Sequence, residues 1–424
     1  MSHARRTLVT AQTAFAVVLL GLCASPALAE PQMSAVSGQM EDRQGRFVSE
    51  GTGRRLTQLQ ELMAEEKFDE AIAGLNALMT KVKDNDYEYA VVLQNLAGAY
   101  LSKGKPEDYR AALPLYEKVL TLKALPIATE NSIVFNLAQL YAQIENYPKT
   151  TALLESWFKV TQNPPASALI LMANALAAQN KWREALPWVE KAIAKSDKPQ
   201  ESWYKLQLAI QYELKDYKAC VATLETMLGY WPGNKKYWEQ IVGMYLELEQ
   251  DSKALSAMAV SHRKGFLTEE KPILNLARMY ILNDAPFEAG KLLDESIAAK
   301  QVAATEKNYS LMAQAWIDAR EWQKATTALG KGGELAADGE LFVRKAQIHV
   351  DQLEYTEAIK AVEKAFVKGK LKRPGYAYMI QGRAAAETKN FKAAEEAFRK
   401  ARGFEDTKKT AESWLQYLGE LQNR

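Results

Sequence analysis

The stretch FKAAEEAFRKA at residues 391–401 decides the fold of this chain. It places an aromatic residue three positions before an alanine, a large apolar residue four positions after that alanine, and a small residue three positions further on. Spacings of three and four bring these side chains to one face of an α-helix. The same pattern occurs as YTEAIKAVEKA at residues 355–365 and as WREALPWVEKA at residues 182–192. Because it returns, the pattern indicates a repeat and not an isolated helix.

The alanine of this pattern recurs along almost the whole chain. From Ala71 to Ala394 it marks nine intervals with a mean of 35.9 residues. Clear copies begin at Phe68, Tyr109, Trp182, Tyr355 and Phe391, weaker ones begin at Tyr147, Tyr217 and Trp322, and two copies keep only Ala254 and Ala289. Cys220 holds the alanine position of its copy, so we expect a buried, structural thiol there.

This repeat resembles the tetratricopeptide repeat, whose period is about 34 residues. The resemblance predicts an all-α fold, a right-handed superhelical solenoid of about ten helix-turn-helix repeats over residues 54–402, with a capping helix within 403–424. One hairpin cannot bury its apolar face alone, so neighbours must stack. The expected pairs lie near 54–82, 89–123, 130–160, 166–195, 201–229, 235–264, 271–299, 305–330, 340–367 and 375–402.

The N-terminal residues have the pattern of an export signal. Arg5 and Arg6 precede the apolar run Ala14–Cys23, and Ala27-Leu28-Ala29 supplies the small residues of a cleavage site. We therefore predict a signal peptide at 1–29 cleaved after Ala29, a flexible lead-in at 30–53, and a periplasmic chain with no integral membrane segment. A lipoprotein signal at Cys23 and a twin-arginine signal fit the flanking residues less well.

The composition limits the classes of function. The chain has 54 Lys and Arg against 52 Asp and Glu, and Arg5 and Arg6 supply the whole excess. This balance argues against a nucleic-acid binder, which normally has a basic face. Two Cys and three His exclude a disulfide scaffold and leave little for a multi-His metal site. We expect a protein without enzymatic activity, cofactor or metal.

Four local features allow a structural interpretation. His349 stands where other copies have an aromatic residue, so we expect a packed side chain, and His262 lies near a helix end. Residues 330–333 read GKGG but lack the spacing of a phosphate-binding loop, so a loop or helix end is expected. The basic stretch Lys368 to Arg373 follows a second helix, and it is either a solvated helix end or a contact for an anionic partner.

A narrower resemblance concerns three stretches of the chain. The first is LTQLQEL at 56–62 with KFDEA at 67–71, and the third is RKGFL at 263–267. The second runs from WYKL at 203–206 through WP at 231–232 to YWEQ at 237–240. They resemble a family of exported repeat proteins described as a component of the TonB system. That resemblance implies a periplasmic accessory role beside TonB-, ExbB- or ExbD-like proteins in energised uptake across the outer membrane.

The tetratricopeptide resemblance also implies a binding surface. In that family the first helix of each pair lines a concave groove, and the residue after the small position points into it. The polar members of this row are Gln139, Asn174, Arg278, Gln314, Gln347 and Arg383, with Gly98 and Gly243 at two further copies. The fifth repeat has conflicting registers at Leu208 and Ala209. A solvated wall is the alternative interpretation, and the row lacks the basic clamp that holds terminal carboxylates in chaperone adaptors.

These observations together predict a scaffold that holds a segment of a protein partner in its groove. An adaptor for envelope or exopolysaccharide assembly is an alternative, because exported repeat arrays serve there as well. A small-ligand-binding or enzyme-accessory subunit is a third possibility.

Overall fold

The computed structural model describes residues 46–422, and every regular element in that range is an α-helix. Ten consecutive helix pairs are followed by one final helix, so the predicted all-α array with a C-terminal helix is confirmed for this part of the chain. The predicted signal peptide at 1–29 and residues 30–45 of the lead-in lie outside the described residues. The right-handed superhelical path stays a prediction. The helices fall into two compact units that divide between Pro232 and Gly233.

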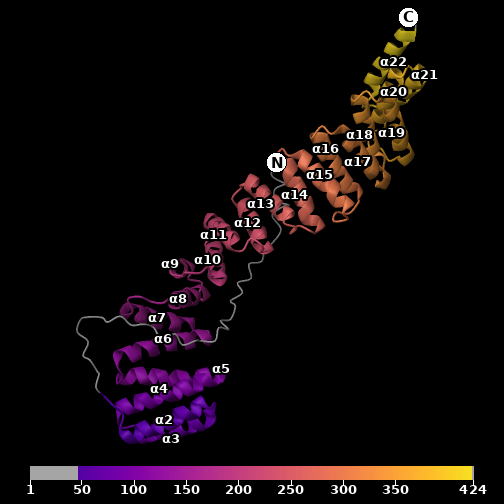
Figure 1. The fold of residues 1–424 in the computed structure, drawn as a ribbon. Coiled ribbons are helices and arrows are strands. Elements are labelled where there is room, and N and C mark those ends of the chain that lie inside the picture. Colours follow the sequence, from indigo (N-terminus) through magenta and orange to yellow (C-terminus); the bar gives the residue numbers. More distant parts are fainter. Residues whose placement is uncertain (1–45, 423–424) are drawn as a thin grey trace. The chain divides into compact units, whose positions relative to one another are not determined.

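The first unit holds five helix pairs, and Figure 1 shows them stacked in chain order. Its helices are α2 (Glu50–Ala64), α3 (Phe68–Lys81), α4 (Asp86–Lys103), α5 (Pro106–Leu122), α6 (Ile127–Gln143), α7 (Tyr147–Val160), α8 (Ala166–Ala178), α9 (Trp182–Ala194), α10 (Glu201–Glu213) and α11 (Tyr217–Tyr230). Each helix packs on the next, and the first helices of neighbouring pairs also touch, as α6 and α8 do.

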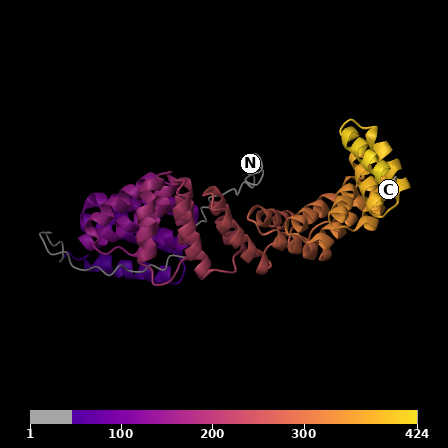
Figure 2. The ribbon, with the colours of Figure 1, turned by 90° about the horizontal axis from the view of Figure 1, so that it is seen from above.

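The second unit holds the other five pairs and the final helix, which Figure 2 shows in colours from rose through orange to yellow. Its helices are α12 (Lys235–Glu247), α13 (Asp251–Arg263), α14 (Glu270–Leu282), α15 (Pro286–Ala298), α16 (Glu306–Asp318), α17 (Trp322–Leu335), α18 (Glu340–Asp351), α19 (Tyr355–Lys368), α20 (Pro374–Glu387), α21 (Phe391–Arg402) and α22 (Lys408–Gln422).

The recurring small position of the repeat is buried in every helix pair. All ten residues at this position are fully buried: Ala71, Ala112, Thr150, Ala185, Cys220, Ala254, Ala289, Ala325, Ala358 and Ala394. A small side chain lets two helices approach closely, while the large residue four positions later, such as Val189 or Phe398, fills the space beside it. The predicted burial of Cys220 is confirmed, and burial raises the pKa of its thiol to about 12. Cys220 therefore stays protonated and unreactive.

The turns inside the pairs share one backbone device that the sequence analysis did not anticipate. In nine of the ten pairs, one residue of the turn has a left-handed conformation with φ near 60°. This residue lies two positions before the start of the pair's second helix, as Glu66, Asn180 and Leu353 do. The next amide then donates to a carbonyl five residues earlier, as Glu354 does to His349 at 2.8 Å. This hydrogen bond caps the first helix and reverses the chain.

The first helix begins earlier than the array predicted from the sequence. The structure starts α2 at Glu50, whereas residues up to 53 were expected to be a flexible lead-in. The reason is Glu88 of α4, whose carboxylate accepts hydrogen bonds from the Ser49 amide at 2.6 Å and the Thr52 hydroxyl at 2.8 Å. Ser49 also caps the helix through its own hydroxyl. A side chain from the next pair therefore orders this turn.

The GKGG stretch at 330–333 lies in the last turns of α17, as the helix-end interpretation requires, but the helix runs on to Leu335. A Cβ at Gly332 would lie 2.9 Å from Leu341, and one at Gly333 would lie 2.9 Å from the Phe342 ring. These glycines let α18 pack closely against the end of α17. Their role is helix packing, and they form no phosphate loop.

Candidate functional site

The second unit brings four of the predicted groove residues to equivalent places on successive first helices. Arg278 lies on α14, Gln314 on α16, Gln347 on α18 and Arg383 on α20, each directly after a buried small residue. Arg278 is exposed, and the other three are half-buried. Each of these four repeats thus places one polar side chain at the same position of its first helix. We call these four residues the polar row.

The other two predicted residues lie in the first unit. Gln139 on α6 and Asn174 on α8 are half-buried at the same repeat position. The predicted row is therefore divided into a pair in the first unit and four residues in the second. In the fifth repeat Leu208 is 2% exposed whereas Ala209 is half-buried, so Leu208 takes the buried position of the repeat and Ala209 the position after it. Like Gly98 and Gly243, it offers no polar group.

Hydrogen bonds between repeats orient the two glutamines of the polar row. Gln314 accepts a 2.9 Å bond from Arg344 of α18 and donates a 2.7 Å bond to Asp318. Gln347 accepts a 2.7 Å bond from the Tyr376 hydroxyl of α20 and donates a 2.7 Å bond to Asp351.

Burial, and next the Asp351 charge, raise the pKa of Tyr376, so its hydroxyl stays a donor at neutral pH. Sequence reasoning missed Arg344, Tyr376 and both aspartates. The signal for the aspartates was present, because an Asp follows each glutamine by four residues and so lies on the same helix face. The contacts of Arg344 and Tyr376 depend on how neighbouring repeats stack.

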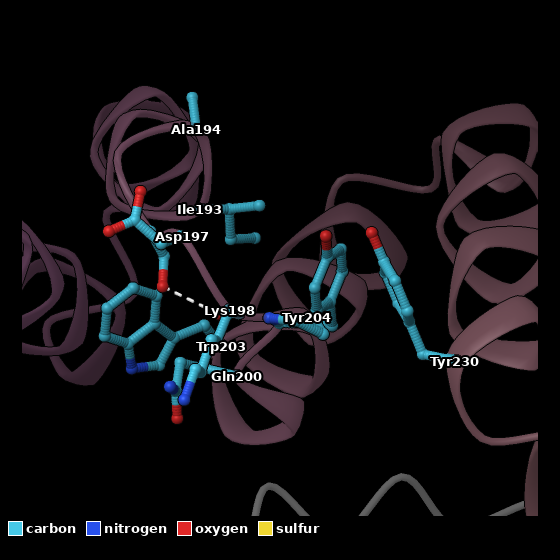
Figure 3. Close-up of a pocket in the computed structure, with 10 residues that line it drawn as sticks. Ile193, Ala194, Asp197, Lys198, Gln200, Trp203, Tyr204 and Tyr230 are labelled. Carbon is cyan, nitrogen blue, oxygen red and sulfur yellow. Dashed lines mark hydrogen bonds between the residues drawn. The ribbon is translucent and has the colours of Figure 1, made fainter.

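A cavity of about 270 Å³ lies in the first unit where the loop between α9 and α10 meets the end of α11. Its lining residues are Ile193, Ala194, Ser196, Asp197, Lys198, Pro199, Gln200, Trp203, Tyr204 and Tyr230. Figure 3 shows the Tyr204 and Tyr230 rings side by side with both hydroxyls directed the same way, and their centroids lie 5.9 Å apart. A 2.7 Å bond from the Ser196 hydroxyl to the Lys198 carbonyl shapes the loop. Burial, and next Tyr230, raise the pKa of Tyr204.

A second cavity, of about 400 Å³, has apolar walls and a charged rim. Leu120, Leu137, Ala152 and Leu153 line it together with Glu117, Tyr141 and Lys149. Lys149 donates to Tyr141 at 2.7 Å and to Glu117 at 3.0 Å, and Tyr141 also donates to Glu117. These bonds lower the pKa of Glu117, Tyr141 contributing most. Glu117, Tyr141 and Lys149 therefore hydrogen-bond to one another at the rim of this cavity.

The two described histidines lie at different kinds of position, one buried and one at a helix end. His349 is 6% exposed, which agrees with the packed position expected for it, and its Nδ1 lies 2.6 Å from the Glu354 carboxylate. His262 lies in the last turn of α13. Within residues 46–422 no group of three His, Cys, Asp or Glu side chains could hold a metal ion. None of the helices in this range is both long and apolar enough to span a bilayer.

Comparison with known proteins supports the repeat assignment. Residues 343–407 match the family model described as a tetratricopeptide repeat. No curated protein matches the chain. The solved structures that resemble it include YrrB, described as a tetratricopeptide protein with an unusual peptide-binding site. The sequence identity is 16% and the TM-score is 0.35, and the match covers 44% of this chain and 91% of that one.

Two further solved structures show the same low level of similarity. Naa15/Naa10 bound to HypK-THB has 16% identity and a TM-score of 0.40 over 85% of this chain and 59% of that one. A tetratricopeptide protein from Parabacteroides merdae has 15% identity and a TM-score of 0.28 over 60% of this chain and 98% of that one. Similarity this low transfers no binding property. The stacked helix pairs and the matched repeat define an all-α solenoid of the tetratricopeptide type.

Proposed function

We propose that this protein is a non-enzymatic periplasmic scaffold that binds a segment of a protein partner along the polar row, as an accessory of a TonB/ExbB/ExbD uptake system. The observation that carries the proposal is the polar row itself, in which Gln314 and Gln347 are held in place by hydrogen bonds from the next repeat. Export and the TonB connection rest on the predicted signal peptide and on the three stretches that resemble the TonB-associated family.

The chemistry of the row suits an extended or helical peptide. Amide side chains both donate and accept hydrogen bonds, so they can bind backbone or polar side chains of a partner. Arg278 and Arg383, at the two ends of the row, add positive charge that favours an acidic side chain at either end of the bound segment. Because the surface is preformed, binding orders few side chains and loses little entropy.

Capture of the partner from a periplasmic extract tests this function. We expect the chain to retain TonB-, ExbB- or ExbD-like proteins, and the variant Arg278→Glu with Arg383→Glu to lose them. The matched control is Lys291→Glu with Lys392→Glu, which makes the same change of charge at exposed sites on the second helices α15 and α21. Capture of no such component, or equal loss in the control, would contradict the proposal.

The aromatic cavity supports a second candidate, a binder of small ligands. Trp203, Tyr204 and Tyr230 offer ring faces, and Asp197, Lys198 and Gln200 offer polar groups around one space. A thermal-shift screen of small metabolites separates the two candidates. A ligand that raises the melting temperature of the chain, but not that of Trp203→Ala with Tyr204→Ala, would favour this function.

A further inference from the structure

The basic stretch Lys368 to Arg373 is partly explained by helix ends. Lys368 donates to the carbonyls of Glu334 at 2.7 Å and Ala336 at 3.0 Å, which belong to the end of the preceding second helix, α17. The expected meeting of a cation with helix-end carbonyls is therefore found, although the carbonyls come from the neighbouring repeat. Lys370 and Lys372 are exposed and have no side-chain partner among the described residues.

The structure places a second basic segment beside this one. Arg373 donates a 3.1 Å hydrogen bond to Asp406, which joins the loop between α19 and α20 to the loop between α21 and α22. The rings of Phe366, Tyr378 and Phe404 stack across the same two repeats, at 4.4 and 6.2 Å between centroids. These contacts hold both loops at one edge of the last two repeats.

This edge carries a strong local excess of positive charge. Residues 368–373 and 402–409 together contain seven basic and two acidic residues, although the whole chain is nearly balanced. Five of the basic residues are exposed and have no side-chain partner in the described range, and we call them the basic edge: Lys370, Lys372, Arg402, Lys408 and Lys409. Lys408 and Lys409 begin α22, where the helix dipole disfavours cations, so helix stability does not explain them.

An apolar side chain projects beside these cations. Val367, in the last turn of α19, is 89% exposed, the highest exposure among the large apolar residues of the described chain. Cations around a projecting apolar residue are the combination that binds the interface of an anionic bilayer. An acidic peptide is better matched by a groove and by paired arginines, whereas four of the five cations here are lysines on loops and a helix start.

We propose that the basic edge docks the C-terminal repeats on the surface of a membrane that contains anionic phospholipids, with the lysines over the phosphate groups and Val367 at the headgroup boundary. Each lysine near such a surface contributes about 1 kcal/mol, or roughly a fivefold gain in binding. The surface is distinct from the polar row, so docking would leave the row on α14, α16, α18 and α20 available to a partner.

Vesicle co-sedimentation tests the proposal. The apolar run at 14–23 would bind vesicles by itself, so the chain is used from Glu30, which keeps every described residue. We expect binding to vesicles of phosphatidylcholine with phosphatidylglycerol, little binding to phosphatidylcholine alone, and release at about 1 M salt, where the Debye length falls to about 3 Å. Lys370→Glu with Lys372→Glu should weaken binding by at least about tenfold, because two favourable charges are lost and two repulsive ones added.

Two further variants of the edge extend the test. Lys408→Glu with Lys409→Glu should act in the same direction from the start of α22, and Val367→Asp should weaken binding without removing a cation. The matched control is Lys389→Glu with Lys392→Glu in the same repeat, at the far end of the 14-residue helix α20 and so about 20 Å from the basic edge. Circular dichroism of each variant confirms that it is folded.

Three results would overturn the proposal. Equal binding to neutral and anionic vesicles would show that charge plays no part, and equal loss in the control would show that the position of the charge is irrelevant. Binding of poly-glutamate or of an oligonucleotide, with no binding to anionic vesicles, would assign the basic edge to a different class of partner.

Discussion

The hydroxyl of Tyr376 in α20 donates a 2.7 Å hydrogen bond to Oε1 of Gln347 in α18. Arg344 makes the corresponding contact with Gln314 one repeat earlier. The polar row is therefore part of the interface between repeats as well as a candidate binding surface. A partner that uses the glutamine oxygens must share them with, or displace, the donor from the next repeat.

Tyr376→Phe removes this hydrogen bond and keeps the ring. We expect the stability of the second unit to fall by about 0.5–1.5 kcal/mol, the usual net contribution of such a bond. Urea unfolding followed by circular dichroism measures the change. Tyr378→Phe is the control, since Tyr378 lies in the same helix and contributes ring stacking but no side-chain hydrogen bond within the described range. An equal loss in both variants would mean that the Tyr376 hydroxyl contributes nothing.

Two glycines in first helices should respond in opposite directions to alanine. A Cβ at Gly382 would lie 2.6 Å from the ring of Phe398, which is fully buried, so Gly382→Ala should cost about 1–3 kcal/mol through overpacking. A Cβ at Gly243 would meet no neighbouring side chain within 4 Å, so Gly243→Ala should stabilise α12 by up to about 1 kcal/mol. Thermal unfolding of both variants gives the signs, and stabilisation by Gly382→Ala would contradict the close contact.

Leu353 has a left-handed backbone conformation and an exposed side chain. Its φ is 61° and its exposure is 67%. Since a left-handed conformation costs a residue with a Cβ about 1–2 kcal/mol, Leu353→Gly should raise the stability by about 0.5–1 kcal/mol. Leu282 is similarly exposed, at 63%, but ends α14 in helical conformation, so Leu282→Gly should lower the stability by about 0.5–1 kcal/mol. Urea midpoints that move in the same direction would contradict the assignment.

The carboxylate of Glu88 makes the first helix pair sensitive to pH. The Ser49 amide, followed by Thr52, holds the pKa of Glu88 below its ordinary value of 4.5. A lowered pKa in the folded state means that the stabilisation is complete above about pH 4.5 and is lost as the pH falls through the folded pKa. Glu88→Gln should therefore lower the stability by about 1–3 kcal/mol at pH 7. The difference from the original chain should shrink at pH 3, and an unchanged difference would show that ionisation of Glu88 is irrelevant.

Much of the fold could be predicted because its rules are local. The aromatic and alanine spacing marked ten helix pairs, and all ten small positions, from Ala71 to Ala394, are fully buried. A helix period is expressed within a few neighbouring residues, so it can be read without knowing the tertiary structure. The left-handed turns escaped prediction because Glu66, Leu353 and Lys389 are not the glycines that normally indicate them.

Sequence alone also specified which residues follow the buried small positions, since that depends only on the register of each helix. The tertiary structure decided which of these residues share a compact unit and which side chains of the next repeat contact them. It placed Gln139 and Asn174 in the first unit and the polar row in the second, and it linked Gln347 to Tyr376. It also joined the loop that carries Lys370 and Lys372 to the loop before α22, through the hydrogen bond from Arg373 to Asp406. Such groupings depend on how whole repeats stack and where a compact unit ends. Contacts between residues about 30 to 40 positions apart leave no periodic trace within a single helix.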